Sequence, residues 1–565
     1  MSYRRLDVAE AAFRDATTRL NSKNLSHLWS WSALLSSLDY LPRVFTHEET
    51  PPFLPSIHPM KIGMFVWAVL KSKALDYKTQ RLSRADFIYV FNRLNDAAAD
   101  PNFLDTSGDE PPEARLLRHF STMVNKQWRF QSKDFLFRCA RTFLLFEELP
   151  KRHAAVLKQR LGSSYLDIPA MFEYVTGLKA KDALFLGFAI ISLLRARLAG
   201  LLKQSRARLA VQPGSNLPNR QAGVLLSLLE SAAAFEGLVK FTKAELPIPS
   251  NMGLPPSVLN SYFAQVARDT RQLRQLTEEG PYTHGFLSYR LNPLERYPLV
   301  QLNGFDDVSF VVPSIPYLDR LATDLPHFVL QESDQIRQRY HETRGHLQEL
   351  YLSDLFQKRL SDHLVIEERA YRRRGENWRG PDFIVCDPKD QRLILIESKA
   401  LRVQARTLAD TGLEALIQDL RDAVAAIKRL PTKVGHLKEG LPEYSDVQQA
   451  LDACLGKQPV AVLVVSEAVE MFAEKVELAR RSGRVRGLED YPYPYCFMDL
   501  ETLEFAVELA ASGQASLSAV LEEYWRTGSG AEASALPADR FGGRTLEAKD
   551  VYLVDGASRL LDSWR

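Results

Sequence analysis

Residues 381–400 read Pro-Asp-Phe-Ile-Val-Cys-Asp-Pro-Lys-Asp-Gln-Arg-Leu-Ile-Leu-Ile-Glu-Ser-Lys-Ala. Two short apolar runs flank a polar turn, so the stretch predicts a β-hairpin. If the two strands pair as neighbours, the start of the first lies beside the end of the second, which brings Asp382 near Glu397. Successive side chains of a strand alternate between faces, so we expect Glu397 and Lys399 on one face and Ser398 on the other.

Two carboxylates beside one lysine predict a metal-dependent phosphodiesterase site. Hard cations such as Mg²⁺ are usually held by one or two carboxylates with several waters retained, and Mn²⁺ takes the same kind of oxygen ligand. We expect Asp382, Glu397 and the backbone oxygen of Ser398 to hold Mg²⁺, for which Mn²⁺ can substitute. Lys399 is expected to orient or deprotonate the attacking water.

A plain hairpin is the alternative interpretation of the same stretch. The three charges are then an exposed turn residue and a solvated strand-end pair, and isolated Pro-Asp or Glu-x-Lys matches are common. The combination favours a site, because a glutamate that ends the run Leu-Ile-Leu-Ile costs free energy to bury unless it has a partner.

The composition is that of an ordinary globular protein. The chain has 565 residues, of which 45% are hydrophobic and 25% charged, and this length predicts two or more domains. A formal net charge of +2 shows no overall basic excess, so any surface for nucleic acid must be local. The four cysteines form no Cys-x-x-Cys pair and the apolar runs are short, which predicts a cytoplasmic protein that does not span a membrane.

The hydrophobic pattern divides the chain into four parts. Apolar residues at intervals of three and four predict an all-helical recognition or regulatory region over 1–296, and short β-rich runs predict a connector over 297–334. Strands then alternate with helices, so we expect an α/β domain over 335–511, followed by a C-terminal tail over 512–565. Within the domain the expected order is helix 335–360, strands 364–368, 383–386 and 393–397, helix 411–429, strand 460–465, helix 468–481 and strand 496–498.

The motif Pro381-Asp382 followed by Glu397-Ser398-Lys399, behind a helix and within an αβββαβ order, resembles the PD-(D/E)XK nuclease superfamily over about residues 335–510. The resemblance implies a restriction-endonuclease-like fold, in which helices flank a central mixed sheet. It also implies Mg²⁺-dependent hydrolysis of phosphodiester bonds, most often those of DNA.

The same resemblance suggests further site residues on the helices. Many members carry a glutamate on the first core helix, and Gly345-His-Leu-Gln-Glu349 resembles that pattern. We therefore expect Glu349 to be a third acidic catalytic residue, with Asp354 as the competing candidate. Related nucleases often place a polar residue near the substrate phosphate on the helix after the motif strand, where Gln418 stands, although a surface helix carries such residues anyway.

A basic segment directly before the motif is the expected contact with nucleic acid. Its candidate residues are Arg372, Arg373, Arg374, Trp378 and Arg379. Arginines supply sequence-independent affinity by neutralising phosphates, and a tryptophan among them can stack on an exposed base. The alternative is a solvated loop with one aromatic residue pinned to the core.

The expected function is a Mg²⁺-dependent DNA endonuclease whose helical half senses a trigger or binds a partner protein. Such an architecture is similar to that of prokaryotic antiphage defence effectors. A double-strand cut usually needs two sites, so a homodimer is expected. Two alternatives stay open: a catalytically inactive nuclease fold that serves as a binding or assembly protein, and an RNase or exonuclease that uses the same residues.

Overall fold

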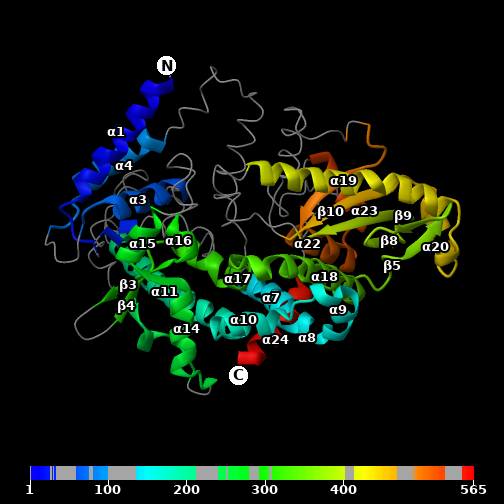
Figure 1. Cartoon of the computed structure of the whole chain (residues 1–565), viewed down its shortest axis with the longest axis horizontal. Helices are drawn as coiled ribbons and strands as arrows, with labels where there is room; N and C mark the ends of the chain where they lie inside the picture. The colour runs from blue at the N-terminus through cyan, green and yellow to red at the C-terminus, as the bar shows by residue number, and fades with distance from the viewer. Residues whose placement is uncertain are drawn as a thin grey trace.

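The computed structural model shows a multidomain protein, with a helical N-terminal region and a mixed β-sheet in the C-terminal half (Figure 1). It describes residues 2–25, 28–29, 31–32, 59–74, 80–98, 135–210, 239–249, 252–278, 292–303, 308–400, 413–466, 488, 490–527 and 550–564. The expected helix over 468–481 lies outside these ranges.

Helices dominate the first part of the chain, as the three-and-four spacing predicts. Their bounds are α1 (Ser2–Leu20), α3 (Pro59–Lys71), α4 (Arg84–Ala98), α7 (Phe135–Phe143), α8 (Leu149–Arg152), α9 (Ala154–Leu161), α10 (Ile168–Thr176), α11 (Ala180–Ala210), α14 (Pro256–Val266), α15 (Thr270–Leu276), α16 (Pro293–Arg296) and α17 (Ile315–Glu332).

The expectation of an all-helical region over 1–296 is wrong in one respect, because a four-stranded sheet begins inside it. Its order is β1-β4-β3-β2. Strands β1 (Lys240–Thr242) and β2 (Ala267–Asp269) precede residue 297, while β3 (Leu299–Asn303) and β4 (Val308–Val311) fall in the expected connector. A strand of three residues is too short to show an alternating pattern, so the sequence carried no readable signal for β1 or β2.

The C-terminal half contains a five-stranded sheet of order β11-β10-β9-β8-β5. The strands are β5 (Leu364–Glu367), β8 (Phe383–Asp387), β9 (Arg392–Lys399), β10 (Val460–Val465) and β11 (Tyr495–Asp499). Strands β9, β10 and β11 run parallel, whereas β8 is antiparallel to both β9 and β5. The sheet is therefore mixed, and each expected strand of this domain is confirmed to within about two residues.

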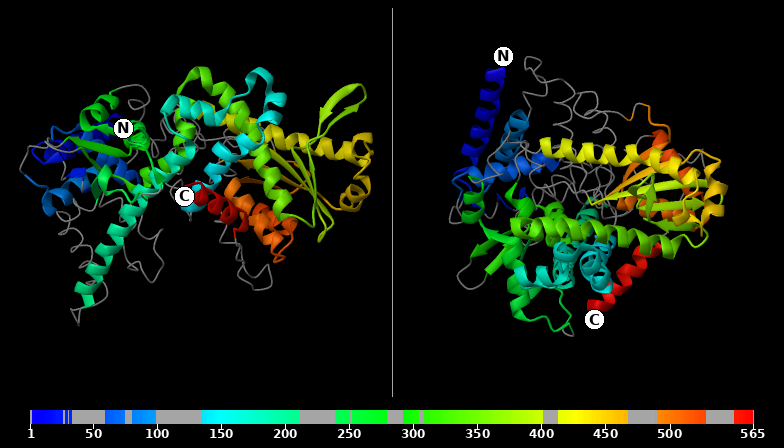
Figure 2. Two further views of the ribbon diagram at one scale, coloured as in Figure 1. Left: turned by 90° about the horizontal axis from the view of Figure 1, so that it is seen from below. Right: turned by 45° about the vertical axis from the view of Figure 1, so that its right-hand side comes forward.

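Helices cover both faces of this sheet, which is why β8, β9 and β10 are almost wholly buried. On one face, α18 (Asp334–Arg359), α22 (Leu500–Ala511) and α23 (Leu517–Thr527) share a hydrophobic core with the N-terminal helices. On the other, α19 (Leu413–Lys438) and α20 (Gln448–Leu455) enclose a second, smaller core. Figures 1 and 2 show α19 and α18 on opposite sides of the sheet.

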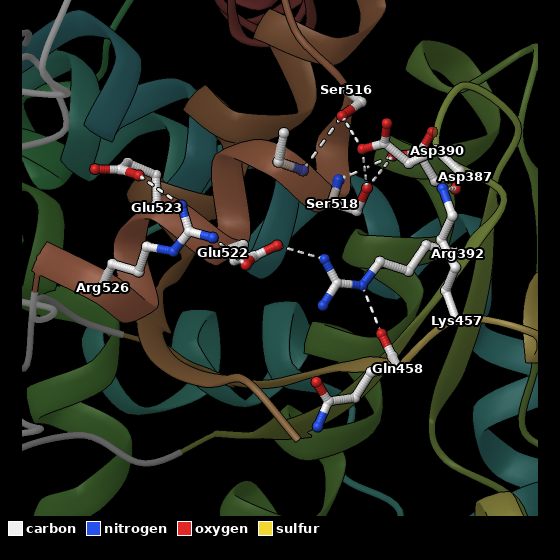
Figure 3. A network of polar contacts seen from close by, with 11 residues as sticks. Asp387, Asp390, Arg392, Lys457, Gln458, Ser516, Ser518, Glu522, Glu523 and Arg526 are labelled. Atoms are coloured by element: carbon white, nitrogen blue, oxygen red, sulfur yellow. Dashed lines mark hydrogen bonds and ion pairs between the residues drawn. The ribbon is translucent and has the colours of Figure 1, made fainter. Parts of the chain in front are cut away.

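The expected C-terminal tail over 512–565 instead contains two packed helices. Helix α23 is tied to the β8–β9 turn, since the backbone N–H and hydroxyl of Ser518 both donate to Asp387 Oδ2 at 2.9 Å (Figure 3). Helix α24 (Val551–Trp564) packs on α7 and α11, and the ring centroids of Trp564 and Phe185 are 5.3 Å apart. These residues therefore complete the core of the molecule.

An ion pair with a buried carboxylate joins the helical region to the sheet-bearing half. Arg141 of α7 holds the carboxylate of Glu504 of α22 through contacts of 2.8 and 2.5 Å, and the hydroxyl of Tyr351 donates to the same carboxylate at 2.6 Å. Close by, Arg359 pairs with Glu508 at 2.7 Å. Arg359 and Glu508 both belong to the sheet-bearing half, whereas the Arg141–Glu504 pair and one hydrophobic core are shared by the two regions.

One helix among the described residues is long and apolar enough to cross a membrane. This segment is Ala180–Gly200 of α11, and 56% of its most apolar window is buried inside the protein. A largely buried core helix passes the same test of length and composition, so the finding is weak evidence for a membrane span.

Candidate metal centre at the ends of β8 and β9

The structure brings Asp382 and Glu397 together, as the hairpin pattern predicts. Phe383 pairs with Ile396, so the next position of the antiparallel ladder sets Asp382 opposite Glu397. The backbone N–H of Ser398 donates to Asp382 Oδ2 at 2.6 Å. The Asp382 carboxyl is thereby fixed at the point where β9 approaches its end.

The two-residue alternation along β9 also has the predicted consequence. Glu397 and Lys399 lie on the face covered by α19, and the Lys399 ammonium is 4.0 Å from Glu397 Oε2. Ser398 points to the opposite face, where its hydroxyl accepts a hydrogen bond of 2.9 Å from the Gln348 amide of α18. The lysine is 40% exposed and the glutamate 7%, so the ammonium stands between the buried carboxylate and solvent.

Burial and crowding of like charges raise the pKa of Asp382 to about 7. Desolvation is the largest cause, followed by the charge of Glu397, and the charge of Glu349 acts in the same direction. The Ser398 N–H and the charge of Lys399 lower this pKa but do not compensate. Two carboxyl groups, those of Glu397 and Glu349, and the ammonium of Lys399 therefore act electrostatically on Asp382.

Glu349 of α18 acts on Asp382 through its charge, and its place among the metal ligands stays a prediction. Its carboxylate contacts His346 Nδ1 at 3.0 Å and Arg160 of α9 at 3.8 Å, and this contact with Glu349 raises the pKa of His346. The competing candidate, Asp354, is instead held 2.9 Å from the Tyr552 hydroxyl, in the interface with α24. Of these two candidates on α18, Glu349 is the one whose charge acts on Asp382.

Two residues that the sequence did not single out hold the site in place. Gln348 is buried, and its amide donates to the backbone oxygens of Lys399 and Val464, both at 3.3 Å, besides the Ser398 hydroxyl. It also accepts from the hydroxyl of Ser466. Gln348 therefore ties the ends of β9 and β10 to α18.

Lys433 of α19 is the second residue that was missed. Its ammonium donates to Glu397 Oε1 at 2.6 Å and to the backbone oxygen of Gly380 at 2.8 Å. The expected helix over 411–429 ends before Lys433, so the sequence pattern did not place this lysine over the sheet. The ammonium groups of Lys433 and Lys399 therefore both lie near the Glu397 carboxylate.

The donor atoms at this centre suit a hard divalent cation. Within the described ranges, no three His, Cys, Asp or Glu side chains form a ready-made metal cage. Mg²⁺ does not require one, since it usually keeps several waters and takes one or two carboxylates. Asp382 and Glu397 supply such oxygens side by side, and burial, followed by the charge of Glu397, raises the pKa of Asp382, so that a bound dication would favour its ionised form.

The expected nucleic-acid segment is a hairpin of β6 (Ala370–Arg373) and β7 (Glu376–Arg379). It stands away from the five-stranded sheet, yellow-green at the upper right of the left panel of Figure 2. Its turn residues Arg374 and Gly375 have positive φ angles, as a two-residue turn of type I′ requires. Arg372, Arg374 and Arg379 are exposed, whereas Arg373 forms an ion pair with Glu439.

The other two candidates for substrate contact have local partners. Trp378 is half-buried and packs edge to face with His436 of α19, the ring centroids being 4.6 Å apart. This packing corresponds to the alternative of an aromatic residue pinned to the core, and its stacking on a base stays a prediction. Gln418 is exposed and bonds Asp422 one turn along α19 at 2.9 Å, so the structure does not bring it to Asp382.

Comparison with known proteins identified no relatives. No family model matches the chain, and no curated protein or solved structure matches it.

Proposed function

We propose that the chain is a Mg²⁺-dependent nuclease of the PD-(D/E)XK type, with a restriction-endonuclease-like fold around its five-stranded sheet. The observation that carries the proposal is the convergence of Asp382, Glu397 and Lys399 at neighbouring strand ends, with Glu349 close enough to raise the pKa of Asp382. DNA is the proposed substrate, and Mn²⁺ is proposed as a substitute for Mg²⁺.

Each residue of the centre has a distinct proposed role. Asp382 and Glu397, with the backbone oxygen of Ser398, would hold the cation, which supplies charge stabilisation at the scissile phosphate and a more acidic water. Lys399, partly exposed beside Glu397, would orient or deprotonate the attacking water. Gln348 keeps the ends of β9 and β10 in register while a substrate binds.

The proposed biological role is antiphage defence, in which the helical region senses a trigger or binds a partner. Its support is structural continuity, because the N-terminal helices share a core with α18, the helix that carries Glu349 and Gln348. A change in that region therefore has a mechanical route to the centre. A homodimer in a cytoplasmic setting is part of the same proposal.

One observation favours a second candidate, a nuclease fold retained for binding or assembly. Lys433 already satisfies one oxygen of Glu397, as a centre without a cation would require. The catalytic proposal nevertheless explains more, since this ion pair leaves the raised pKa of Asp382 and the exposed ammonium of Lys399 without a role.

Cleavage of a supercoiled plasmid in the presence of Mg²⁺ tests the catalytic proposal. The wild-type chain should nick or linearise the plasmid, whereas Asp382→Ala and Lys399→Ala should lose about 100-fold or more of the rate. Equal nicking by all three preparations would refute the assignment. Labelled single-stranded RNA and end-blocked linear DNA, assayed in parallel, separate an endonuclease acting on DNA from an RNase or an exonuclease.

A further inference from the structure

Lys433 binds one of the two carboxylate oxygens of Glu397, which is a candidate metal ligand. Its ammonium bonds Glu397 Oε1 at 2.6 Å, and only 12% of the lysine side chain and 7% of the glutamate side chain are exposed. The other oxygen, Oε2, faces Lys399 at 4.0 Å, which is beyond hydrogen-bond length. The two oxygens of Glu397 are therefore unequal, one engaged and one available.

The local fold keeps Lys433 in place. Pro431 lies inside α19 and cannot donate the backbone bond that would normally reach Ile427. The hydroxyl of Tyr491 donates to the Ile427 oxygen at 3.1 Å instead, so α19 continues past the proline and carries Lys433 over the sheet.

The second bond of Lys433 fixes its ammonium relative to the motif. It donates to the backbone oxygen of Gly380, two residues before Asp382, at 2.8 Å. A Cβ atom at Gly380 would lie 2.4 Å from the Tyr444 hydroxyl, so this backbone approaches its neighbours closely. Because the ammonium is anchored at both Gly380 and Glu397, it is a fixed part of the centre.

We propose that Lys433 determines which divalent cation the centre accepts, an inference that rests on the proposed metal-dependent function. With Oε1 engaged, Glu397 offers a cation Oε2 alone. Ca²⁺ favours six to eight oxygens and often takes both oxygens of one carboxylate, whereas Mg²⁺ is satisfied by single carboxylate oxygens and water. Lys433 thus acts as a specificity-determining residue that disfavours Ca²⁺.

The ratio of the Mg²⁺ and Ca²⁺ affinities separates the effect of Lys433 on coordination from the effect of its positive charge. Removing the Lys433 ammonium removes a positive charge near the centre, which strengthens the binding of any dication to a similar degree. Freeing Oε1 for two-oxygen coordination benefits Ca²⁺ selectively. The dissociation constant of Mg²⁺ divided by that of Ca²⁺ therefore reports the coordination effect.

Calorimetric titration of the full-length chain with MgCl₂ and CaCl₂ separately tests the inference, using the wild type, Lys433→Met, Lys433→Arg and Lys428→Met. Lys428→Met is the matched control, because this lysine is exposed on the same helix. The ratio should shift toward Ca²⁺ by about tenfold in Lys433→Met, and stay within about twofold of the wild type in the other two variants.

Two results overturn the inference, and they are distinguishable from failure of the proposed function. A ratio in Lys433→Met within twofold of the wild type, or a loss of selectivity in Lys433→Arg, refutes the role of Lys433 alone. If the wild type binds neither cation in a way that Glu397→Gln abolishes, the metal centre itself fails. Circular dichroism of each variant confirms folding, and Lys433→Leu, which also removes the ammonium and should give the same shift toward Ca²⁺, replaces Lys433→Met if that variant does not fold.

Discussion

Replacing Asp382 by asparagine should stabilise the metal-free protein at alkaline pH, although it destroys the proposed centre. The folded-state pKa of Asp382 is about 7, against an ordinary value of 3.8. A folded pKa above the unfolded one means that the native state binds the proton more tightly. Stability is therefore fully present below the unfolded pKa and is lost progressively as pH rises from about 4 to about 7.

The size of the stability change follows from the raised pKa of Asp382. About three pH units at 1.36 kcal/mol each give about 4 kcal/mol at pH 8, an upper value because water reaches this half-buried carboxyl. Asparagine carries no charge, and its side-chain oxygen can still accept the Ser398 N–H bond. Between pH 5 and pH 8 the stability advantage of Asp382→Asn should grow by up to about 3 kcal/mol, which is roughly 2–3 °C in Tm for a chain of 565 residues that unfolds as one unit.

Thermal unfolding of both proteins at pH 5 and pH 8, in the presence of a chelator, measures this difference. Asp446→Asn is the control, because the pKa of Asp446 is lowered by its hydrogen bond to Arg369 and its replacement should gain nothing with rising pH. Adding Mg²⁺ at pH 8 should raise the Tm of the wild type and leave that of Asp382→Asn unchanged. A Tm gap that is equal at the two pH values, or narrower at pH 8, refutes the electrostatic account of the centre.

Three further substitutions test other parts of the structure. Gln348→Met should cost about 2–4 kcal/mol of unfolding free energy, because it leaves buried partners on β9 and β10 without their hydrogen bonds; a cost below about 0.5 kcal/mol in denaturant titration contradicts this. Arg141→Met should cost about 3–5 kcal/mol by leaving the Glu504 charge buried alone, and adding Glu504→Gln should recover part of it; full additivity in the double-mutant cycle argues against the pair. Arg372→Ala should lower the salt dependence of DNA affinity by about one unit of log–log slope, and an unchanged slope by fluorescence anisotropy removes this exposed arginine from the proposed DNA surface.

The hairpin at residues 381–400 was predictable because two independent signals agree there. Apolar runs of strand length flank a turn, and the alternation along β9 sets Glu397 and Lys399 on one face. The antiparallel register then leaves Asp382 no position other than opposite Glu397. Local periodicity and turn chemistry are enough for such a motif, since its partners are neighbours in sequence.

Lys433 was not predictable, because its contact depends on residues far apart in the chain. The expected helix over 411–429 ends just before Pro431, where a proline normally stops a helix. Helix α19 instead continues to Lys438, since Tyr491 satisfies the carbonyl group that the proline leaves open. This tertiary hydrogen bond, together with the burial of Leu430, Val434 and Leu437, accompanies the continuation of the helix that carries Lys433 to Glu397.

The basic segment over residues 370–379 also has tertiary contacts that the local sequence pattern did not predict. Its sequence indicated a charged loop, yet residues 370–379 form the β6–β7 hairpin. Trp378 lies against His436 of a helix that the local pattern could not place. Composition therefore predicted the charge of this surface and not which of its side chains face solvent.

Anomalous diffraction from crystals soaked in MnCl₂ tests the metal centre most directly. The structure predicts one or more manganese peaks within about 2.0–2.4 Å of carboxylate oxygens of Asp382 and Glu397, with Lys433 still bonded to Glu397 Oε1. Crystals of Asp382→Asn should lack the peak. A wild-type crystal with no manganese at these carboxylates, or with manganese held elsewhere alone, would contradict the account.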